Sequence, residues 1–485
     1  MKNSVKQNYI YNLTYQILVI ILPLITAPYI SRVLGAENIG IYSYTTSISA
    51  YFILFGSLGV NLYAQREIAF HQSDKKENSI TFLEIVILRT ITMLISIAIF
   101  CISFVANGEY SYFYKILIVE LIAQCLDISW FFSGLEEFKK TVSRNLIIKC
   151  ISVVSIFLLV KTQEDLDMYF WIYVLSTIIG NISLWFYLPK YLDKVKVREL
   201  NIIKHLKPML VMFIPEIAIQ VYTILDKTMI GAIWEDKSEV GFYQQSERIV
   251  KLLLTVITSL GTVLLPRIAS CFANNKKKEV FEYLKKSFNF VYILAFPMIF
   301  GIIAVADKFV PLFFGPGYDR VIILMRVISP IILFIGMSNV IGRQFLLPTK
   351  RQKQYTASVI IGAVVNLIMN SCLIWKYGAL GASIGTVIAE FSVTLAQIIF
   401  VRNDLNIIEV LKPSMKYLIA SSIMFLICKL LGLIRVTNLL SIILQVGCGV
   451  IIYIFMLLLL KDKFTLDMLK QLKGKLIKSQ KESNR

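Results

Sequence analysis

The sequence contains few charged residues and no long polar segment. Asp, Glu, Lys and Arg make up only 17% of its 485 residues, whereas hydrophobic residues make up 57%. The mean hydropathy is +0.70, and a soluble protein of this length could not bury so much apolar surface. The shortage of charge therefore excludes a soluble globular protein and indicates one polytopic unit embedded in a membrane.

Residues that carry catalytic or metal chemistry are also scarce. The two histidines, His71 and His205, fall in basic loops, where we expect solvated side chains. The seven cysteines are scattered without a C-x-x-C pair, so we predict neither a disulfide nor a metal site. There is no phosphate-binding P-loop and no Ser/His/Asp set in suitable spans. These absences predict a transporter rather than an enzyme, with no cofactor beyond a coupling H⁺ or Na⁺.

What the chain does contain is a series of apolar runs of roughly 20 residues, the length of a helix that crosses a hydrocarbon core. The run that starts at Tyr9 is too long for the apolar part of a signal peptide, so we expect it to be retained. The pattern predicts an all-α membrane protein with about fourteen transmembrane helices. The predicted spans are 9–31, 39–63, 81–105, 113–132, 143–160, 168–188, 208–232, 241–266, 286–306, 322–347, 355–375, 381–401, 415–432 and 438–460.

Positive charge is distributed unevenly between alternate loops. The net charge is +19, and the loops on the side of the N-terminus hold roughly four times as many Lys and Arg as the others. Because cytoplasmic loops carry such an excess, we predict that both termini are cytoplasmic, and nucleic acid is not needed to explain the charge. The tail at 461–485 fits either an amphipathic helix on the anionic inner leaflet or a solvated tail.

An internal repeat links two distant parts of the chain. The segment 35–42 reads G-A-E-N-I-G-I-Y, and the segment 231–243 likewise begins with G-A, continues with an acidic turn and ends with G-F-Y. The two copies are an even number of spans apart, so they share one orientation, as in transporters built from a parallel repeat.

An aromatic and then charged string, W-F-F-S-G-L-E-E-F-K-K, follows the fourth predicted span at 130–140. Its composition predicts a membrane–water junction with Trp130 at the headgroup level. As an ordered string it resembles a signature of Wzx-type flippases, which translocate lipid-linked oligosaccharides for O-antigen, capsule and teichoic acid synthesis. They belong to the MATE/MurJ-like (MOP) exporter superfamily, and 32–42, 225–231 and 377–386 resemble its other motifs. The motif residues are Gly35, Glu37, Gly40, Tyr42, Trp130, Gly134, Glu136 and Lys139.

This resemblance implies two six-helix lobes around a central cavity, in the cytoplasmic membrane of a bacterium. It implies as partners a polyprenyl-diphosphate-linked oligosaccharide, membrane lipids, a polysaccharide polymerase and glycosyltransferases. Asn12 and Gln16 stand in span one, where MurJ-like members carry arginines, which favours capsule or teichoic acid synthesis over a peptidoglycan role. The implied domains are an N-terminal lobe at 1–200, a C-terminal lobe at 201–405, two further helices at 406–460 and a basic tail at 461–485.

Several charged side chains lie inside predicted spans, where each charge costs at least ~2.5–3.5 kcal/mol and needs a cavity or a partner. Arg89 and Lys251 lie near mid-depth, and Arg248 shares a helix face with Lys251. We predict that these cations hold the diphosphate, whereas Lys149 and Arg326 are shallow enough to snorkel. The candidate substrate-binding residues are Arg89, Arg248, Lys251, Lys227, Gln244, Lys149 and Arg326. The candidate coupling-ion residues are Glu216, Glu390, Asp226 and Asp127.

Other roles and functions stay open. Arg89 could instead form an ion pair with Glu84 or Glu120, and Lys251 could pair with Glu247 along one helix. The favoured function is a flippase for undecaprenyl-diphosphate-linked repeat units that works by alternating access. A MATE-like multidrug or cation antiporter is the alternative and would favour an anionic cavity. A membrane enzyme would require a large external loop with catalytic Arg or His, which the sequence lacks.

The predicted topology can be tested by labelling in a variant without native cysteines. Cysteines introduced at Asn3 and Ser483 should resist an impermeant thiol reagent applied to intact cells, because both ends are predicted to be cytoplasmic. A cysteine at Asn38, in the first predicted external turn, should react. Reaction of either terminus from outside would contradict the predicted orientation.

Overall fold

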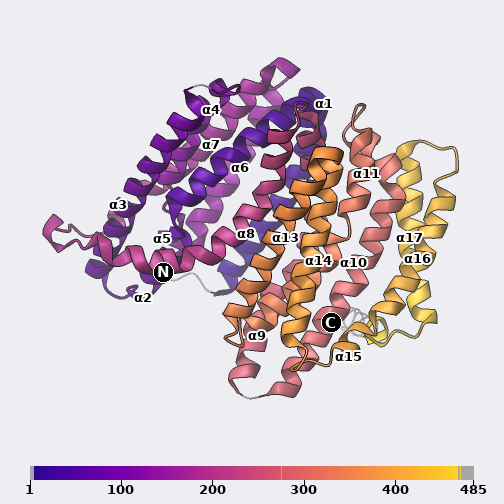
Figure 1. Ribbon diagram of the computed structural model, residues 1–485. Helices are drawn as coiled ribbons and strands as arrows, with labels where there is room; N and C mark the ends of the chain where they lie inside the picture. Colours follow the sequence, from indigo (N-terminus) through magenta and orange to yellow (C-terminus); the bar gives the residue numbers. More distant parts are fainter. Residues whose placement is uncertain (1–4, 107, 275, 468–469, 471–485) are drawn as a thin grey trace, which may run out of the picture. The chain divides into compact units, whose positions relative to one another are not determined.

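The computed structural model describes residues 5–106, 108–274, 276–467 and 470. Side chains are described for these residues except 5–20, 197, 215, 260, 262, 263 and 266. Over these described ranges the chain is helical and contains no strand (Figure 1). It divides into two compact units, Met1–Gly241 and Phe242–Arg485. The predicted all-α membrane fold is confirmed, while the predicted lobe boundaries stay predictions.

Each unit is a set of long helices with a few short ones between them. Helices of the first unit are α1 (Val5–Ser57), α2 (Val60–Phe70), α3 (Lys75–Phe100), α4 (Ser111–Cys125), α5 (Ser129–Gly134), α6 (Phe138–Leu159), α7 (Leu166–Trp185) and α8 (Leu206–Ile233). Helix α9 (Ser238–Ala273) begins in the first unit and continues into the second. The second unit adds α10 (Lys277–Phe313), α11 (Asp319–Ile328), α12 (Ile331–Ser338), α13 (Gln352–Tyr377), α14 (Ala379–Val401), α15 (Ile407–Leu411), α16 (Ser414–Leu431) and α17 (Asn438–Leu459).

The number of membrane spans depends on how bent helices are counted. Among the described residues, 11 helical segments are long and apolar enough to cross a membrane, or up to 12 if the two parts of α8 form one span. The two parts of α8 meet at an angle of 52° between Ile214 and Glu216. One segment, Ile21–Phe70, contains the second predicted span and part of the first. The number fourteen therefore stays a prediction.

Helix α1 is interrupted at Gly35, the first glycine of the predicted repeat. Gly35 has a φ of 77°, in the left-handed region that favours glycine, and a ψ of 173°. The break separates the first predicted span from the second, and Glu37 lies exposed just beyond it. The turn that the motif predicts at this place is therefore present.

The two copies of the repeat meet backbone to backbone at Gly40 and Gly241. A Cβ atom on Gly40 would lie 1.7 Å from the carbonyl oxygen of Lys237, and a Cβ atom on Gly241 would lie 2.0 Å from the carbonyl oxygen of Ala36. Both distances are far below van der Waals contact, so only glycine fits at either position. Equivalent glycines thus build one reciprocal contact, which gives the repeat a structural role.

The aromatic part of the 130–140 string is buried inside the protein. Trp130, Phe131 and Phe132 are at most 2% exposed and pack in a core with residues of α2 and α3. Gly134 permits this packing, because a Cβ atom there would lie 2.8 Å from the carbonyl oxygen of Gln65 on α2. Trp130 is therefore buried because α5 docks closely on α2, while its position at the headgroup level stays a prediction.

His205 is buried as well, so the expectation of a solvated loop residue is wrong. Its Nδ1 lies 2.7 Å from the hydroxyl oxygen of Tyr63, and its Nε2 lies 2.8 Å from Oε2 of Glu84. Lys204 binds the same carboxylate at 2.8 Å. This buried cluster ties the segment before α8 to α2 and α3, which is why the histidine is withdrawn from water.

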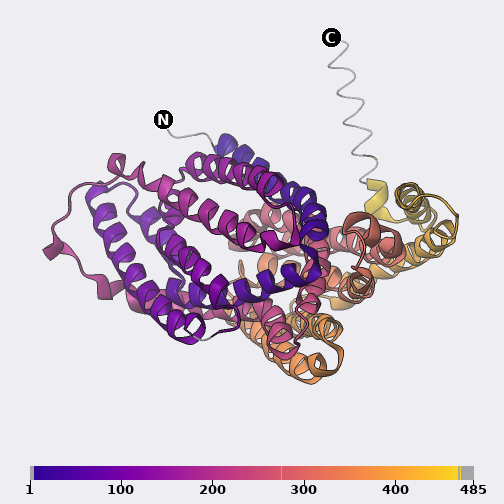
Figure 2. The same cartoon turned by 90° about the horizontal axis from the view of Figure 1, so that it is seen from above.

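In the second unit, α16 and α17 pack together against α10 (Figures 1 and 2). The hydroxyl group of Tyr453 on α17 donates to the carbonyl oxygen of Ile293 on α10 at 3.0 Å. Gln445 on α17 and Cys428 on α16 exchange two hydrogen bonds, at 3.1 and 3.2 Å. The two helices that follow the second predicted lobe are therefore bound to α10 by polar as well as apolar contacts.

The glycine contact predicts that Gly40→Ala and Gly241→Ala each destabilise the protein. Each added methyl group meets a backbone carbonyl that cannot move aside, and such overpacking costs about 1–3 kcal/mol. Gly447→Ala is the control, because nothing lies within 4 Å of a Cβ atom there. Thermal unfolding of the purified proteins should show a lower midpoint for both repeat variants only. Equal midpoints in all variants would contradict the contact.

Candidate functional site

The predicted fourth span is broken between α4 and α5, and three side chains bind the carbonyl groups at the break. Arg89 Nη1 donates to the carbonyl oxygen of Asp127 at 2.6 Å, and Trp130 Nε1 donates to the same oxygen at 3.1 Å. Trp185 Nε1 donates to the carbonyl oxygen of Leu126 at 2.8 Å. Unsatisfied carbonyl groups in hydrocarbon cost several kcal/mol each, so these donors make the break tolerable.

Arg89 and Asp127 therefore have structural roles in this structure. Arg89 is 2% exposed, and the carboxylate of Asp127 accepts a hydrogen bond from the backbone N–H of Ser129 at 2.9 Å, at the start of α5. The ion pairs considered for Arg89 with Glu84 or Glu120 are absent, because a backbone carbonyl is its partner. A role of Arg89 in binding a diphosphate stays a prediction, as does a role of Asp127 in ion binding.

Glu120 is a buried acid that the sequence predicts as part of a polar stripe of the fourth span, or as a partner of Arg89. It is 4% exposed and accepts hydrogen bonds from Ser49 Oγ at 2.9 Å and from the hydroxyl group of Tyr173 at 2.5 Å. These donors come from α1 and α7, so the carboxyl group connects three helices. Its spacing with Gln124 and Asp127 on one helix face is the signal by which the sequence could have revealed it.

A polar pocket of about 340 Å³ lies next to Tyr173, between α1, α6 and α7. Arg144 Nη1 donates to the carbonyl oxygen of Gly180 and to Oδ1 of Asn181, both at 2.9 Å. Of the predicted substrate-binding residues, Lys149 lines this pocket. Amides, hydroxyl groups and two cations together can hold water or an anionic, hydroxyl-bearing group. Its polar lining includes Arg144, Asn145, Lys149, Tyr173, Thr177 and Asn181.

Three predicted site residues lie on α8. Asp226 is 2% exposed, and nearby Thr228 forms a hydrogen bond with Ser47 Oγ on α1 at 2.9 Å. Lys227 and Glu216 are half-buried, and Glu216 directly follows the bend of α8. Their roles in binding a substrate or an ion stay predictions.

The predicted cations of α9 are less buried than Arg89. Lys251 Nζ binds Glu247 Oε1 at 2.6 Å, so the predicted ion pair along the helix is confirmed. The Lys251 side chain is nevertheless 42% exposed, whereas that of Glu247 is 5% exposed. Arg248 and Gln244 are half-buried on the same helix. The exposed ammonium group of Lys251 can therefore approach an anion while Glu247 holds its position.

Equivalent tyrosines of the repeat bind equivalent helices. The ring of Tyr42 lies 5.7 Å from that of Tyr173 on α7, the sixth predicted span. The hydroxyl oxygen of Tyr243 lies 3.0 Å from Thr386 Oγ1 on α14, the twelfth predicted span. Glu390 lies one turn after Thr386 and is 6% exposed. The repeat thus places Glu390, a predicted ion-binding residue, on the helix that receives the second tyrosine.

Arg326 belongs to a charged cluster at one end of α11. Its guanidinium group binds Asp307, and its Nε donates to the carbonyl oxygen of Ile303 at 3.2 Å. Lys429 binds the same carboxylate at 3.3 Å. The cluster links α10, α11 and α16, and it gives Arg326 a structural partner beside its predicted role in substrate binding.

The charged part of the 130–140 string forms the turn between α5 and α6. Glu136 has a φ of 61°, and both Glu136 and Lys139 are exposed. The ammonium group of Lys140 lies 4.0 Å from the ring centroid of Tyr191. Burial raises the pKa of Tyr191 to about 12, and the neighbouring Glu137 adds to the shift. These contacts hold the turn against the segment that follows α7.

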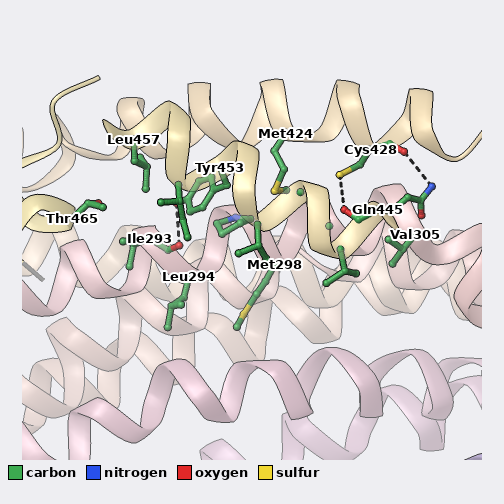
Figure 3. Close-up of a pocket in the computed structure, with 16 residues that line it drawn as sticks. Ile293, Leu294, Met298, Val305, Met424, Cys428, Gln445, Tyr453, Leu457 and Thr465 are labelled. Atoms are coloured by element: carbon green, nitrogen blue, oxygen red, sulfur yellow. Dashed lines mark hydrogen bonds between the residues drawn. The ribbon is translucent and has the colours of Figure 1, made fainter. Parts of the chain in front are cut away.

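An apolar groove of about 400 Å³ runs between α10, α16 and α17 (Figure 3). The hydrogen bonds of Tyr453, Cys428 and Gln445 occupy most of its polar groups. Sequence reasoning missed the groove because its lining consists of the same residue types as a lipid-facing helix surface. Side chains that line it include Leu294, Met298, Val305, Met424, Tyr453 and Leu457.

Two family models match this chain. Residues 5–272 match "Polysaccharide biosynthesis protein", and residues 147–459 match "Lipid II flippase MurJ". A relative described as "Putative O-antigen transporter" from Escherichia coli (strain K12) is 27% identical, and the match covers 83% of this chain and 98% of the relative. "Capsular polysaccharide biosynthesis protein CapF" from Staphylococcus aureus is 23% identical over 73% of this chain and 88% of that protein.

The fold also resembles a solved structure. "Lipid II flippase MurJ, inward closed conformation" superposes with a TM-score of 0.70 at 17% identity, over 95% of this chain and 100% of that chain. Each family model covers more than half of the 485 residues. The chain therefore belongs to the Wzx-type polysaccharide flippases of the MATE/MurJ-like MOP exporter superfamily.

Proposed function

We propose that this protein carries an undecaprenyl-diphosphate-linked oligosaccharide repeat unit from the cytoplasmic to the outer leaflet by alternating access. The observation that carries the proposal is the apolar groove of the second unit, in a family whose relatives are described as O-antigen transporter and lipid II flippase. A substrate with a long hydrocarbon chain and a polar head needs separate surfaces for the two parts. The groove offers a surface for the hydrocarbon chain.

The groove suits a polyprenyl chain because of its shape. Lipid tails are as apolar as the lining residues, so entry of the chain gains little hydrophobic free energy. A groove between packed helices instead restricts the chain to one path and leaves the helix hydrogen bonds intact. We infer that the groove positions the hydrocarbon chain while the polar head crosses the membrane.

Lys251 is the best-placed predicted cation for the diphosphate. Its side chain is 42% exposed, and Glu247 orients it at 2.6 Å without burying it. Arg248 lies on the same helix and is half-buried. A cation that contacts a phosphate oxygen forms a short, charge-assisted hydrogen bond. Arg89 contributes to the fold instead, since its guanidinium group is buried against a carbonyl oxygen.

The finer assignments follow from the same proposal. A relative described as a capsular polysaccharide biosynthesis protein supports synthesis of a surface polysaccharide, with a polymerase and glycosyltransferases as functional partners. The protein itself would be a transporter without catalytic activity, with both termini in the cytoplasm.

Complementation tests the proposal: expression in a strain that lacks its own oligosaccharide flippase should restore surface glycan. Resistance to cationic drugs without glycan export would favour the antiporter alternative.

Filling the groove should impair transport. Gly301 lines the groove, and nothing lies within 4 Å of a Cβ atom there, so Gly301→Leu projects into the groove without striking the backbone. Gly447→Leu is the matched control, because this glycine has the same free space but does not line the groove. We expect reduced glycan export in the Gly301 variant at normal protein abundance. Equal export by the two leucine variants would contradict binding of the hydrocarbon chain in the groove.

Lys251→Ala and Arg89→Ala should fail in different ways. Loss of one charge-assisted contact, worth ~1.5–3 kcal/mol, should weaken substrate binding by Lys251→Ala roughly ten- to hundredfold. Because Lys251→Ala also leaves the buried Glu247 carboxylate without its positive partner, stability is compared in the double variant Glu247→Gln/Lys251→Ala, which removes both charges and should keep near-normal thermal stability. Arg89→Ala leaves the Asp127 carbonyl with one donor fewer, so it should lower thermal stability by about 1–3 kcal/mol. A stable Arg89→Ala protein without transport would show instead that Arg89 binds the substrate.

A further inference from the structure

Glu120 is a buried carboxyl group that the proposed transport scheme does not yet use. It lies on α4, is 4% exposed, and is held by the hydroxyl groups of Ser49 and Tyr173. A hydroxyl group can donate to a carboxylate and can also accept from a carboxylic acid. The two partners can therefore satisfy Glu120 in either protonation state.

Among the described residues, no cation forms an ion pair with Glu120. Two other buried acids differ in this respect: Glu84 binds Lys204 at 2.8 Å, and Glu247 binds Lys251 at 2.6 Å. A buried carboxylate without a positive partner carries a desolvation cost of several kcal/mol. Neutral donors offset part of this cost, so the balance between the two states of Glu120 can shift with its surroundings.

The helices packed on α4 bring few charged groups toward Glu120. Arg89 on α3 is bound to the carbonyl oxygen of Asp127 and so is directed to the break after α4. Titratable groups on the elements packed on α4, namely α1, α3, η1 (Cys101–Val105) and α7, include Tyr42, Arg89, Cys101, Tyr169 and Tyr173.

Tyr173 connects Glu120 to the polar pocket of the first unit. Its side chain lines that pocket of about 340 Å³, and its hydroxyl group donates to Glu120 Oε1. Arg144 and Lys149 line the same pocket and add positive charge to its lining. The Tyr173 side chain thus contacts both the buried carboxyl group and the pocket.

We propose that Glu120 binds the coupling proton of transport and that Tyr173 relays it between the pocket and the carboxyl group. This inference rests on the proposed flippase function. A protonated water in the pocket gives one proton to the Tyr173 hydroxyl group, which gives its own to Glu120 Oε1. The carboxylate becomes a carboxylic acid, Tyr173 regains its hydroxyl proton, and no other bond changes.

Contacts in the first unit connect this proton site to the repeat. The ring of Tyr173 lies 5.7 Å from that of Tyr42, and Tyr169 lies 4.8 Å from Tyr42. Tyr42 follows Gly40 by two residues, and Gly40 meets the backbone of Lys237. A change in the hydrogen bonds of Tyr173 on protonation therefore acts on the side chain next to the reciprocal glycine contact. This arrangement gives proton binding a direct physical connection to the motif that joins the two copies of the repeat.

Infrared difference spectra of the purified full-length protein, recorded between alkaline and acidic buffer, test proton binding without any transport assay. The wild type should show a carboxylic acid C=O band that Glu120→Gln lacks and that Tyr173→Phe shifts, because the latter loses the phenol hydrogen bond. Glu199→Gln, an exposed acid bound to Lys76, is the control and should leave the band unchanged. A titrating band that persists unaltered in Glu120→Gln would overturn the proposal.

Transport then tests coupling. Export is measured at acidic and at alkaline external pH, in cells in which the wild type restores glycan export. The ratio of the two values should be about one in Glu120→Gln, which cannot titrate. It should differ from one in the wild type and in Glu120→Asp. Wild-type pH dependence in Glu120→Gln would overturn the coupling role. If the wild type restores no export, the proposed flippase function fails, and the infrared spectra still decide whether Glu120 binds a proton.

Discussion

A polypeptide that crosses hydrocarbon must satisfy its own backbone hydrogen bonds, and this requirement explains the charges inside the first unit. The break between α4 and α5 leaves carbonyl groups without their helical partners, within a predicted membrane span. Arg89, Trp130 and Trp185 supply the missing donors. An arginine in the middle of a span is therefore not always a substrate ligand. Here its guanidinium group stabilises an irregular backbone, and the tryptophan of the family motif shares the same carbonyl oxygen.

Much of the fold can be predicted from the sequence, because apolar runs and repeats are patterns along the chain and do not depend on which helices meet. Apolar runs predict membrane helices, and the repeat predicts a turn after its first glycine, as seen at Gly35. The close backbone contact of Gly40 and Gly241 became visible only in the structure. The partners of polar side chains are different, because they depend on which helices meet. The depth of Arg89 in its span was predicted correctly to require a partner, yet nothing in the sequence shows that this partner is a carbonyl group 38 residues away.

The same limit explains what the sequence analysis missed at the candidate sites. The groove between α10, α16 and α17 has the composition of a lipid-facing surface, so only the packing of the helices reveals it. Glu120 stood on a recognisable polar stripe, but its isolation from cations became visible only with Ser49 and Tyr173 in place. His205 was misjudged because a basic loop can still fold onto an acidic, buried partner such as Glu84.

We propose that different surfaces of this flippase serve different parts of the substrate: the apolar groove for the lipid chain and the cations of α9 for the diphosphate. Reconstitution in sealed vesicles tests directly whether the protein transports such a substrate. A polyprenyl-diphosphate oligosaccharide with a labelled sugar is placed in the vesicles, and an impermeant sugar-cleaving enzyme is added outside. The account predicts that the fraction of labelled sugar protected from the enzyme decreases with time only when the protein is present. The same protected fraction in vesicles with and without protein would contradict it.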